Sequence, residues 1–282
     1  PDIVRKIETD LETVRAPGVS DSLAERLVVE SLIADRVASG QEETVVRSHK
    51  TFWSGARAVA FHATADKRLE TNFFGKHGAL FEELQRVLSS GGYHRLCEIG
   101  CGSGVLTNLL AERLPALTEV IGLDLCPQQT AINSNRFSNP RVRFVAADAT
   151  TWVPEHATAG TVYLTYDRVL EYFAQAELNT MLRGMAVRTP CCFALMEPIA
   201  PDYDLEREVD SRLYGQEMAF SHNYPRAFSA AGFRIHWQEE LPKARYLMMI
   251  ACKDGAAREA ACRPTRRRAV DANGQITESD QP

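Results

Sequence analysis

The chain has 282 residues, of which 45% are hydrophobic and 24% are charged, and 32 Lys and Arg against 37 Asp and Glu give a formal charge of −5. This composition is typical of a soluble globular protein, and the mildly acidic balance argues against a general nucleic-acid binder, which needs a large basic face. No apolar run approaches the roughly 18 residues that cross a bilayer. We therefore expect a cytoplasmic protein without a membrane or nucleic-acid partner.

The seven cysteines are too few and too irregularly placed for a disulfide framework. Cys97 and Cys101 are four residues apart, Cys191 and Cys192 are adjacent, and no CxxC pair occurs that would indicate a metal or redox site. We expect reduced thiols and no metal centre.

Residues 1–90 have the periodicity of helices. Apolar side chains recur at intervals of three and four residues, as at Leu80, Leu84 and Val87, which predicts amphipathic helices. The glycines of 89–92 end the last of them. We expect these residues to form an N-terminal helical cap.

From residue 91 to 253, short β-rich runs alternate with helical stretches. The runs lie at 95–100, 119–125, 141–147, 161–167 and 191–198, and the helical stretches lie at roughly 105–114, 127–137 and 174–188. This alternation implies right-handed crossovers and a mostly parallel sheet. Two further runs, 233–240 and 244–252, are too close together for a helical crossover and predict an antiparallel hairpin. The predicted fold is α/β, a Rossmann-like seven-stranded mostly parallel sheet with a C-terminal antiparallel hairpin.

Residues 254–282 contain almost no aromatic or large aliphatic side chains. Such a segment cannot bury enough apolar surface to fold alone, so it predicts a disordered tail. Its arginines at 263 and 266–268 are either solvated or available to an acidic partner.

A glycine-rich turn follows the first predicted strand, in CEIGCGSGVLT at 97–107. Glycines at 100, 102 and 104 let a ligand approach the backbone, and the helix that follows offers free amides. The pattern is GxGxG, with Val105 where a dinucleotide fingerprint has its last glycine, and no lysine followed by Ser or Thr marks a P-loop. The turn therefore predicts a nucleotide-like ligand without a pyrophosphate or polyphosphate.

Three carboxylates are expected at the same edge of the sheet. Asp124 ends the second strand, 24 residues after Gly100, where it can accept hydrogen bonds from ribose hydroxyls, and Asp148 follows the third strand, where it can accept one from an adenine amino group. With Glu98 they should line one crevice. Three carboxylates suit a cationic nucleoside better than a polyphosphate.

The motifs EIGCGSG, GLDL, AADAT and DRVLEYF, in this order within roughly residues 93–252, resemble those of class I S-adenosylmethionine-dependent methyltransferases. The resemblance implies an enzyme with S-adenosylmethionine as cofactor, in which Asp124 holds the ribose diol, Asp148 and Ala149 frame the adenine, and Glu98 orients the turn. The cofactor-binding residues that it implies are Glu98, Gly100, Cys101, Gly102, Gly104, Asp124, Leu125, Asp148, Ala149 and Arg168.

These assignments have structural alternatives. The glycines form a tight turn in any case, Asp124 is also suited to cap the helix that begins near Pro127, and Asp148 to a turn. Arg168 pairs either with an acceptor carboxylate or with Glu171 or Asp167.

The acceptor site is predicted from the remaining segments. The fourth strand ends in YLTYDRVLEYF, which lacks the NPPY or DPPY of nucleobase and glutamine N-methyltransferases of this fold, and it makes Tyr166 a candidate catalytic residue. The long connection 198–224 is expected to be a lid that meets the N-terminal section over the crevice. The predicted acceptor-binding residues are His62, Tyr203, Tyr214 and Tyr224.

His222 is the candidate general base, because imidazole titrates near neutral pH; the alternative is a structural histidine. The leading hypothesis is methyl transfer to an O or N atom of a small organic metabolite in natural-product biosynthesis. The alternatives are a methyltransferase acting on a peptide or protein carboxylate or side chain, and a catalytically inactive nucleoside-binding regulatory protein. Val105 and the terminal hairpin oppose a dehydrogenase.

Overall fold

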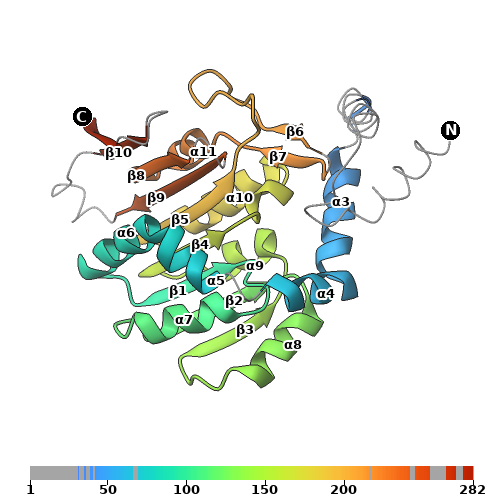
Figure 1. The fold of residues 1–282 in the computed structure, drawn as a ribbon, viewed down its shortest axis with the longest axis vertical. Coiled ribbons are helices and arrows are strands. Elements are labelled where there is room, and N and C mark those ends of the chain that lie inside the picture. The colour runs from blue at the N-terminus through green and yellow to red at the C-terminus, as the bar shows by residue number, and fades with distance from the viewer. Residues whose placement is uncertain are drawn as a thin grey trace.

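The computed structural model describes residues 31, 35, 39–40, 42–65, 69–215, 217–241, 245–254, 265–270 and 276–281. Most of the helical region predicted before residue 42 lies outside these residues. A nine-stranded sheet forms the centre of the molecule, with helices on both of its faces (Figure 1). Among the described helices, none has the length and apolar content needed to cross a membrane.

The sheet has the order β11-β10-β8-β9-β5-β4-β1-β2-β3. Its strands are β1 Arg95–Ile99, β2 Glu119–Asp124, β3 Val142–Ala146, β4 Thr161–Tyr166, β5 Cys191–Pro198, β8 Arg234–Leu241, β9 Tyr246–Lys253, β10 Thr265–Val270 and β11 Ile276–Gln281. The five neighbouring strands β5, β4, β1, β2 and β3 are parallel to one another. Strand β9 pairs antiparallel with both β5 and β8. The predicted seven-stranded sheet with its terminal hairpin is confirmed.

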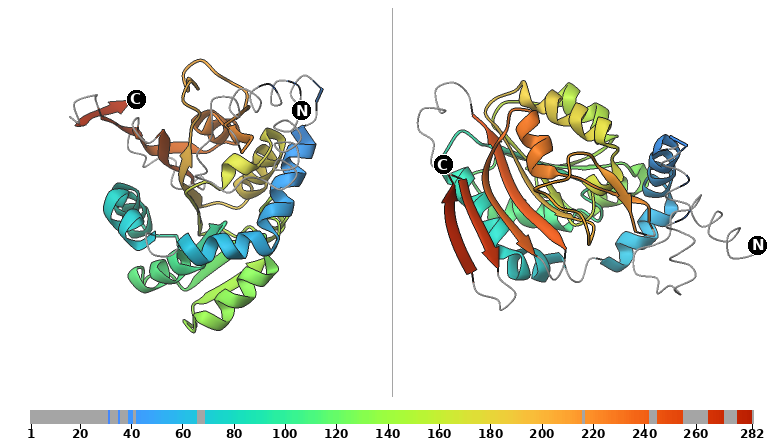
Figure 2. Two further views of the ribbon diagram at one scale, coloured as in Figure 1. Left: turned by 45° about the vertical axis from the view of Figure 1, so that its right-hand side comes forward. Right: turned by 90° about the horizontal axis from the view of Figure 1, so that it is seen from above.

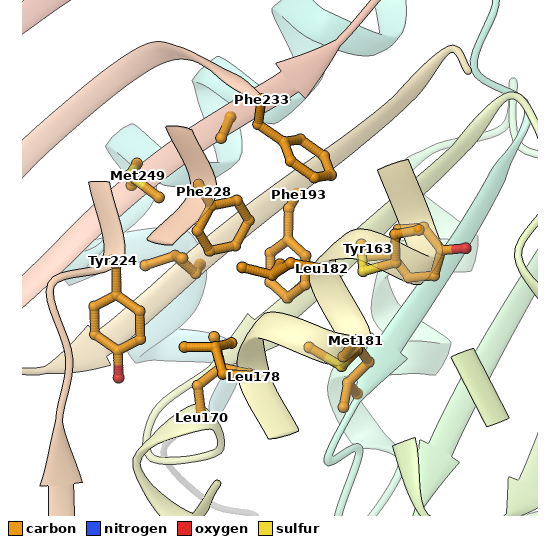
Figure 3. Packing of buried hydrophobic residues seen from close by; sticks show 14 of the residues in the cluster. Tyr163, Leu170, Leu178, Met181, Leu182, Phe193, Tyr224, Phe228, Phe233 and Met249 are labelled. Carbon is orange, nitrogen blue, oxygen red and sulfur yellow. The ribbon is translucent and has the colours of Figure 1, made fainter. Parts of the chain in front are cut away.

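The helices form two layers. They are α3 Glu42–Trp53, α4 Ala56–Ala65, α5 Leu69–Thr71, η2 Asn72–Lys76, α6 Gly78–Ser89, α7 Val105–Arg113, α8 Pro127–Arg136, α9 Ala149–His156, η3 Leu170–Tyr172, α10 Gln175–Ala186 and α11 Tyr224–Ala230. One face of the sheet packs on α6 and α7, and the other packs on α9, α10 and α11 through a buried cluster that includes Leu182, Phe193 and Phe228 (Figure 3). Helix α9 was not predicted, and it contains Pro154, a residue that argues against a helix interior.

A small second sheet carries the connection after β5. Its strands are β6 Arg212–Tyr214 and β7 Ala219–Ser221, and it packs against α3 through Val45, Val46, Leu213, Met218 and Phe220. Helices α3 and α4 lie on the opposite side of the molecule from β10 and β11 (Figure 2). The connection after β5 therefore packs against the N-terminal section.

Residues 265–270 and 276–281, which the sequence predicts to be disordered, form β10 and β11. Strand β10 pairs in parallel with β8, with Arg266 opposite Trp237. The composition of residues 254–282 indicates only that this segment cannot fold alone. An existing edge strand supplies backbone hydrogen-bonding groups, so a polar segment can join it without a core of its own.

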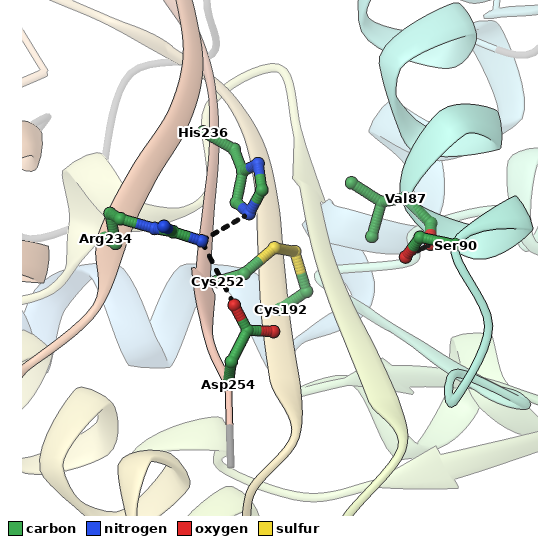
Figure 4. The surroundings of a disulfide bond; sticks show 7 residues. All are labelled: Val87, Ser90, Cys192, Arg234, His236, Cys252 and Asp254. Atoms are coloured by element: carbon green, nitrogen blue, oxygen red, sulfur yellow. Dashed lines mark hydrogen bonds and ion pairs between the residues drawn. A yellow bond between two sulfur atoms is a disulfide. The ribbon is translucent and has the colours of Figure 1, made fainter. Parts of the chain in front are cut away.

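Cys192 on β5 and Cys252 on β9 are directly opposite in the sheet and form a disulfide (Figure 4). The prediction of reduced thiols is wrong for this pair. The two residues are 60 positions apart in the sequence, so their spacing gave no indication of the pairing. Cys97, Cys101 and Cys191 are buried free thiols.

Candidate functional site

A cavity of about 630 Å³ opens at the carboxyl ends of the parallel strands. This is the edge at which open α/β sheets bind ligands. Its walls are Glu98–Ser103, Leu123–Leu125, Ala147–Ala149, Tyr166–Val169, Tyr172 and Phe173 from the sheet side, and His49, Lys50, Trp53, Phe61, His62, Leu69 and Asn72 from α3, α4, α5 and η2. The cavity thus lies between the strand ends and the N-terminal helices.

The glycine turn is packed so closely that its positions 100, 102 and 104 leave no room for a side chain. Gly100 and Gly102 have φ angles of 72° and 48°, in the left-handed region. A Cβ on Gly100 would lie 2.7 Å from Val169 Cγ2, and one on Gly102 would lie 2.8 Å from His62 Cε1. Gly104 is the N-cap of α7 and does not line the cavity. The turn is therefore shaped by its neighbours as well as by the backbone.

Asp124 is buried at the end of β2 and holds two backbone amides. Its Oδ2 accepts a hydrogen bond from Gly102 N at 2.8 Å, and its Oδ1 accepts one from Cys126 N at 2.9 Å. Burial raises the pKa of this carboxyl group to about 6, although these hydrogen bonds lower it. Each carboxylate oxygen has a second lone pair, so Asp124 can still accept hydrogen bonds from a ligand.

Glu98 is the second carboxyl group under the turn. It is 4% exposed, and its Oε2 accepts a hydrogen bond from the Thr107 hydroxyl. Burial and the charge of Asp124 raise its pKa to about 8, although the hydrogen bond from Thr107 lowers it. A cation bound beside these two groups would favour their ionised forms.

Asp148 follows β3 and connects this part of the cavity wall to the N-terminal section. Its Oδ1 accepts a hydrogen bond from Thr150 N at 2.9 Å, which caps α9, and its Oδ2 lies 2.7 Å from Lys50 Nζ on α3. Burial opposes ionisation of Asp148, but hydrogen bonds from Lys50 and Thr150 outweigh it and lower the pKa. Lys50 also lies 2.6 Å from Glu177. Asp148 is therefore both a helix cap and a wall of the cavity.

The loop after β4 is strained at the rim of the cavity. Asp167 and Arg168 have φ angles of 62° and 73°, which non-glycine residues rarely adopt. The Tyr246 hydroxyl donates to Asp167 Oδ1 at 2.6 Å, and Arg168 Nη1 lies 3.3 Å from Glu171 Oε1. Arg168 thus makes the ion pair that the sequence offered as the structural alternative. Asp167 was not predicted, and its backbone conformation cannot be recognised without the tertiary contacts.

His222 does not line the cavity. It is 1% exposed, its Nδ1 lies 2.6 Å from Ser211 Oγ, and its Nε2 lies 3.0 Å from Leu170 O. Burial lowers its pKa to about 4. With both ring nitrogens bonded inside the protein, it is a structural histidine, and the general-base assignment is not supported.

The three tyrosines of the predicted lid do not line the cavity either. The Tyr203 hydroxyl donates to Asp210 O, the Tyr214 hydroxyl donates to Glu171, and Tyr224 belongs to the buried cluster against the sheet (Figure 3). The lid instead supports α3, because His49 Nε2 lies 3.2 Å from Met218 O. The lid also contacts two cavity-lining residues directly, because Glu217 accepts a hydrogen bond from the Tyr172 hydroxyl and lies 3.5 Å from Arg168.

Of the predicted acceptor-binding residues, His62 alone lines the cavity. It lies between the glycine turn and Trp53, with 5.9 Å between ring centroids. His49 and Lys50 were not predicted, whereas Trp53 belongs to the aromatic N-terminal section that was expected over the crevice. All three lie on α3. His49 and Trp53 are four residues apart and share one face of the helix, and Lys50 follows His49 on the adjoining face.

The sequence model of the family described as "Methyltransferase domain" matches residues 96–188. Trans-aconitate 2-methyltransferase of Methylobacterium radiotolerans is 48% identical over 60 residues, which cover 21% of this chain and 22% of that protein. The enzyme of the same name from Acidovorax sp. is 35% identical over 89 residues, covering 32% and 33%. These alignments span a third or less of the relatives' own length.

Among solved structures, magnesium protoporphyrin IX methyltransferase of Synechocystis with bound S-adenosylmethionine is similar with a TM-score of 0.46 and 14% identity, covering 68% of this chain and 86% of that one. The family match spans the strand ends and the glycine turn that form one side of the cavity. Residues 96–188 are therefore similar in sequence to a methyltransferase domain.

Proposed function

We propose that the protein transfers the methyl group of S-adenosylmethionine to an oxygen or nitrogen atom of a small, uncharged organic acceptor. The observation that carries this proposal is that a single cavity of about 630 Å³ contains both the glycine turn with its carboxylates and a partly aromatic end formed by the N-terminal helices. This volume is in the range of pockets that enclose small molecules.

The cofactor side fits an adenosyl sulfonium. The turn at Gly100 and Gly102 lines the cavity, Asp124 has lone pairs for a ribose diol, and Asp148 and Ala149 flank the expected adenine position. Glu98 adds a carboxyl group for the cationic end. When bound, the cofactor supplies an electrophilic methyl carbon. The protein has to hold the acceptor atom in line with it, at about 3 Å.

The acceptor side is formed by Phe61, Leu69, Asn72, Tyr166 and Asp167. These residues come from α4, α5, η2 and the end of β4, so the acceptor is expected between helices and strand ends. This enclosure favours a small molecule over a folded protein.

The charges that line the cavity argue against a polyanionic acceptor. Among the described lining residues, the full cations are Lys50 and Arg168, and each lies within 3.5 Å of two carboxylates. His49 is neutral because burial lowers its pKa to about 4. A tricarboxylate would add three negative charges without a free cation to receive them. We therefore propose that the acceptor differs from trans-aconitate, the compound in the names of the relatives.

Methyl-labelled S-adenosylmethionine with a panel of acceptors tests this proposal. The panel contains neutral phenols, alcohols and amines, trans-aconitate and short peptides, and calorimetry with S-adenosylhomocysteine and with NAD runs beside it. We expect S-adenosylhomocysteine to bind, NAD not to bind, and label to pass to neutral acceptors, including intermediates of natural-product biosynthesis. Preference for trans-aconitate or for peptides would contradict the proposed acceptor class. Binding of S-adenosylhomocysteine without transfer to any acceptor would favour a regulatory protein.

A further inference from the structure

A hydrogen bond joins the acceptor side of the cavity to a histidine that the sequence did not single out. Tyr166 is the last residue of β4 and lines the cavity, and its Oη lies 2.7 Å from His77 Nδ1. His77 is half-buried and stands between η2 and α6. The pair therefore reaches from the cavity to the helical layer.

The backbone of η2 holds this histidine in position. Its turn is a π-helix, in which His77 N donates to Asn72 O at 2.8 Å. Such turns are rare and recur at functional sites. Here one turn carries Asn72, which lines the cavity, and His77, which contacts the Tyr166 hydroxyl.

Packing fixes the direction of the tyrosine ring. The buried Phe73 packs edge-on against Tyr166, with 4.9 Å between centroids and 83° between ring planes. The hydroxyl group thus has a defined partner, which is a requirement for proton transfer along a hydrogen bond.

The surroundings of the pair favour proton transfer from the Tyr166 hydroxyl to His77. Burial lowers the pKa of His77, Asp167 raises it and Lys76 lowers it, so the imidazole is neutral near pH 7. Burial raises the pKa of Tyr166, so the phenol keeps its proton. A neutral imidazole with hydrogen on Nε2 accepts from a phenol at Nδ1.

We propose that Tyr166 and His77 form the proton exit for a hydroxyl acceptor during methyl transfer, with Tyr166 as the catalytic residue and His77 as the group that receives its proton. This inference rests on the proposed function. As the acceptor oxygen bonds to the methyl carbon, its O–H bond breaks and the proton bonds to Tyr166 Oη. The original Tyr166 O–H bond breaks at the same time, and that proton bonds to His77 Nδ1. The cofactor sulfur keeps the electron pair of its broken bond to the methyl group, and His77 then loses a proton from Nε2 to solvent.

Asp167 assists this route by its charge. It follows Tyr166 directly, lines the cavity, and is held by the Tyr246 hydroxyl at 2.6 Å. Its carboxylate stabilises an imidazolium at His77, while Lys76 opposes it. The positive charge that leaves the sulfonium donor therefore reappears beside a negative side chain.

Two measurements test the relay. Nitrogen NMR of the imidazole in the full-length protein, assigned with His77→Gln, should show His77 neutral with hydrogen on Nε2. Steady-state kinetics with a hydroxyl acceptor should show Tyr166→Phe and His77→Gln lowering kcat by about 100-fold, the size typical of general base catalysis. The wild-type kcat should rise with pH through the titration of His77, and this step should disappear in His77→Gln. The exposed His156→Gln is the matched control and should keep both rate and pH profile.

The outcomes separate the two proposals. Hydrogen on Nδ1, or full turnover by Tyr166→Phe, would overturn the relay while methyl transfer by the wild type stands. A wild-type protein that methylates no acceptor would overturn the proposed function, and the relay with it, whereas methylation of nitrogen acceptors alone would overturn only the relay. Calorimetry with S-adenosylhomocysteine should give the same affinity for all variants, which excludes misfolding as the cause of a lost rate.

Discussion

The carboxylate of Asp124 accepts a hydrogen bond from the backbone N–H of Gly102, with 2.8 Å between Oδ2 and the amide nitrogen. This bond ties the glycine turn after β1 to the end of β2, although the two residues belong to different crossovers. The side chain that is expected to meet the ribose therefore also positions the turn that is expected to meet the methionine. Loss of this carboxylate should affect both parts of the cofactor site.

Asp124→Asn should weaken the binding of S-adenosylhomocysteine by about 2 kcal/mol, roughly 30-fold, because an amide group replaces a charged acceptor of two backbone hydrogen bonds. Calorimetry measures this change. The exposed Asp202→Asn, which does not line the cavity, is the control. Equal affinities in the two variants would remove Asp124 from the cofactor site.

Gly102→Ala should lower cofactor affinity about tenfold or more, because its Cβ would lie 2.8 Å from the His62 ring and would push that ring or the turn into the cavity. Gly215→Ala provides the control, since Gly215 has a φ of 64° but no atom within 4 Å of the added Cβ. Both variants share the backbone strain, so the difference between them measures the close approach. A similar loss in both would mean that backbone strain alone causes it.

Cofactor affinity should rise as the pH increases from about 6 to about 8. In the free protein, burial raises the pKa of Asp124 to about 6 and that of Glu98 to about 8, and a cationic nucleoside favours the ionised form of both. Binding should therefore release protons in this interval. Calorimetry in buffers of different ionisation enthalpy measures that release, and an affinity that falls with rising pH would contradict the expected ligand contacts.

Glu197→Gln should flatten the dependence of stability on pH. Glu197 is fully buried, accepts a hydrogen bond from Val169 N at 3.0 Å, and has its pKa raised to about 8 by burial. Because the folded protein binds this proton more tightly than the unfolded chain, the stabilisation is complete below pH about 4.3 and is lost as the pH rises through about 8.

Thermal unfolding of the cofactor-free protein between pH 5 and 9 checks this expectation. The glutamine remains neutral, so the melting temperature of Glu197→Gln should fall less across that range than that of the wild type. The exposed Glu155→Gln should follow the wild type. Parallel curves for Glu197→Gln and the wild type would show that Glu197 does not titrate in this range.

Local features of the sequence were sufficient to predict the seven-stranded part of the sheet and the meeting of the glycine turn, Asp124 and Asp148 at one of its edges. The alternation of strands and helices determines the parallel crossovers, and a glycine turn followed by Asp124 and Asp148 at strand ends places those groups at one edge. These inferences need only short-range periodicity and the handedness of the crossovers. They do not depend on which distant side chains pack together.

The tertiary structure decided the protonation and pairing of the remaining groups. His77 reaches Tyr166 across 89 positions of the sequence, and Cys192 reaches Cys252 across 60. Burial makes His222 a structural residue, although its type suggested a base. The sequence by itself thus determined the main part of the sheet and the edge at which the glycine turn, Asp124 and Asp148 meet, because local periodicity and turn chemistry encode them. Only the tertiary structure decided which other side chains line the cavity, because their contacts and burial depend on elements that are remote in the chain.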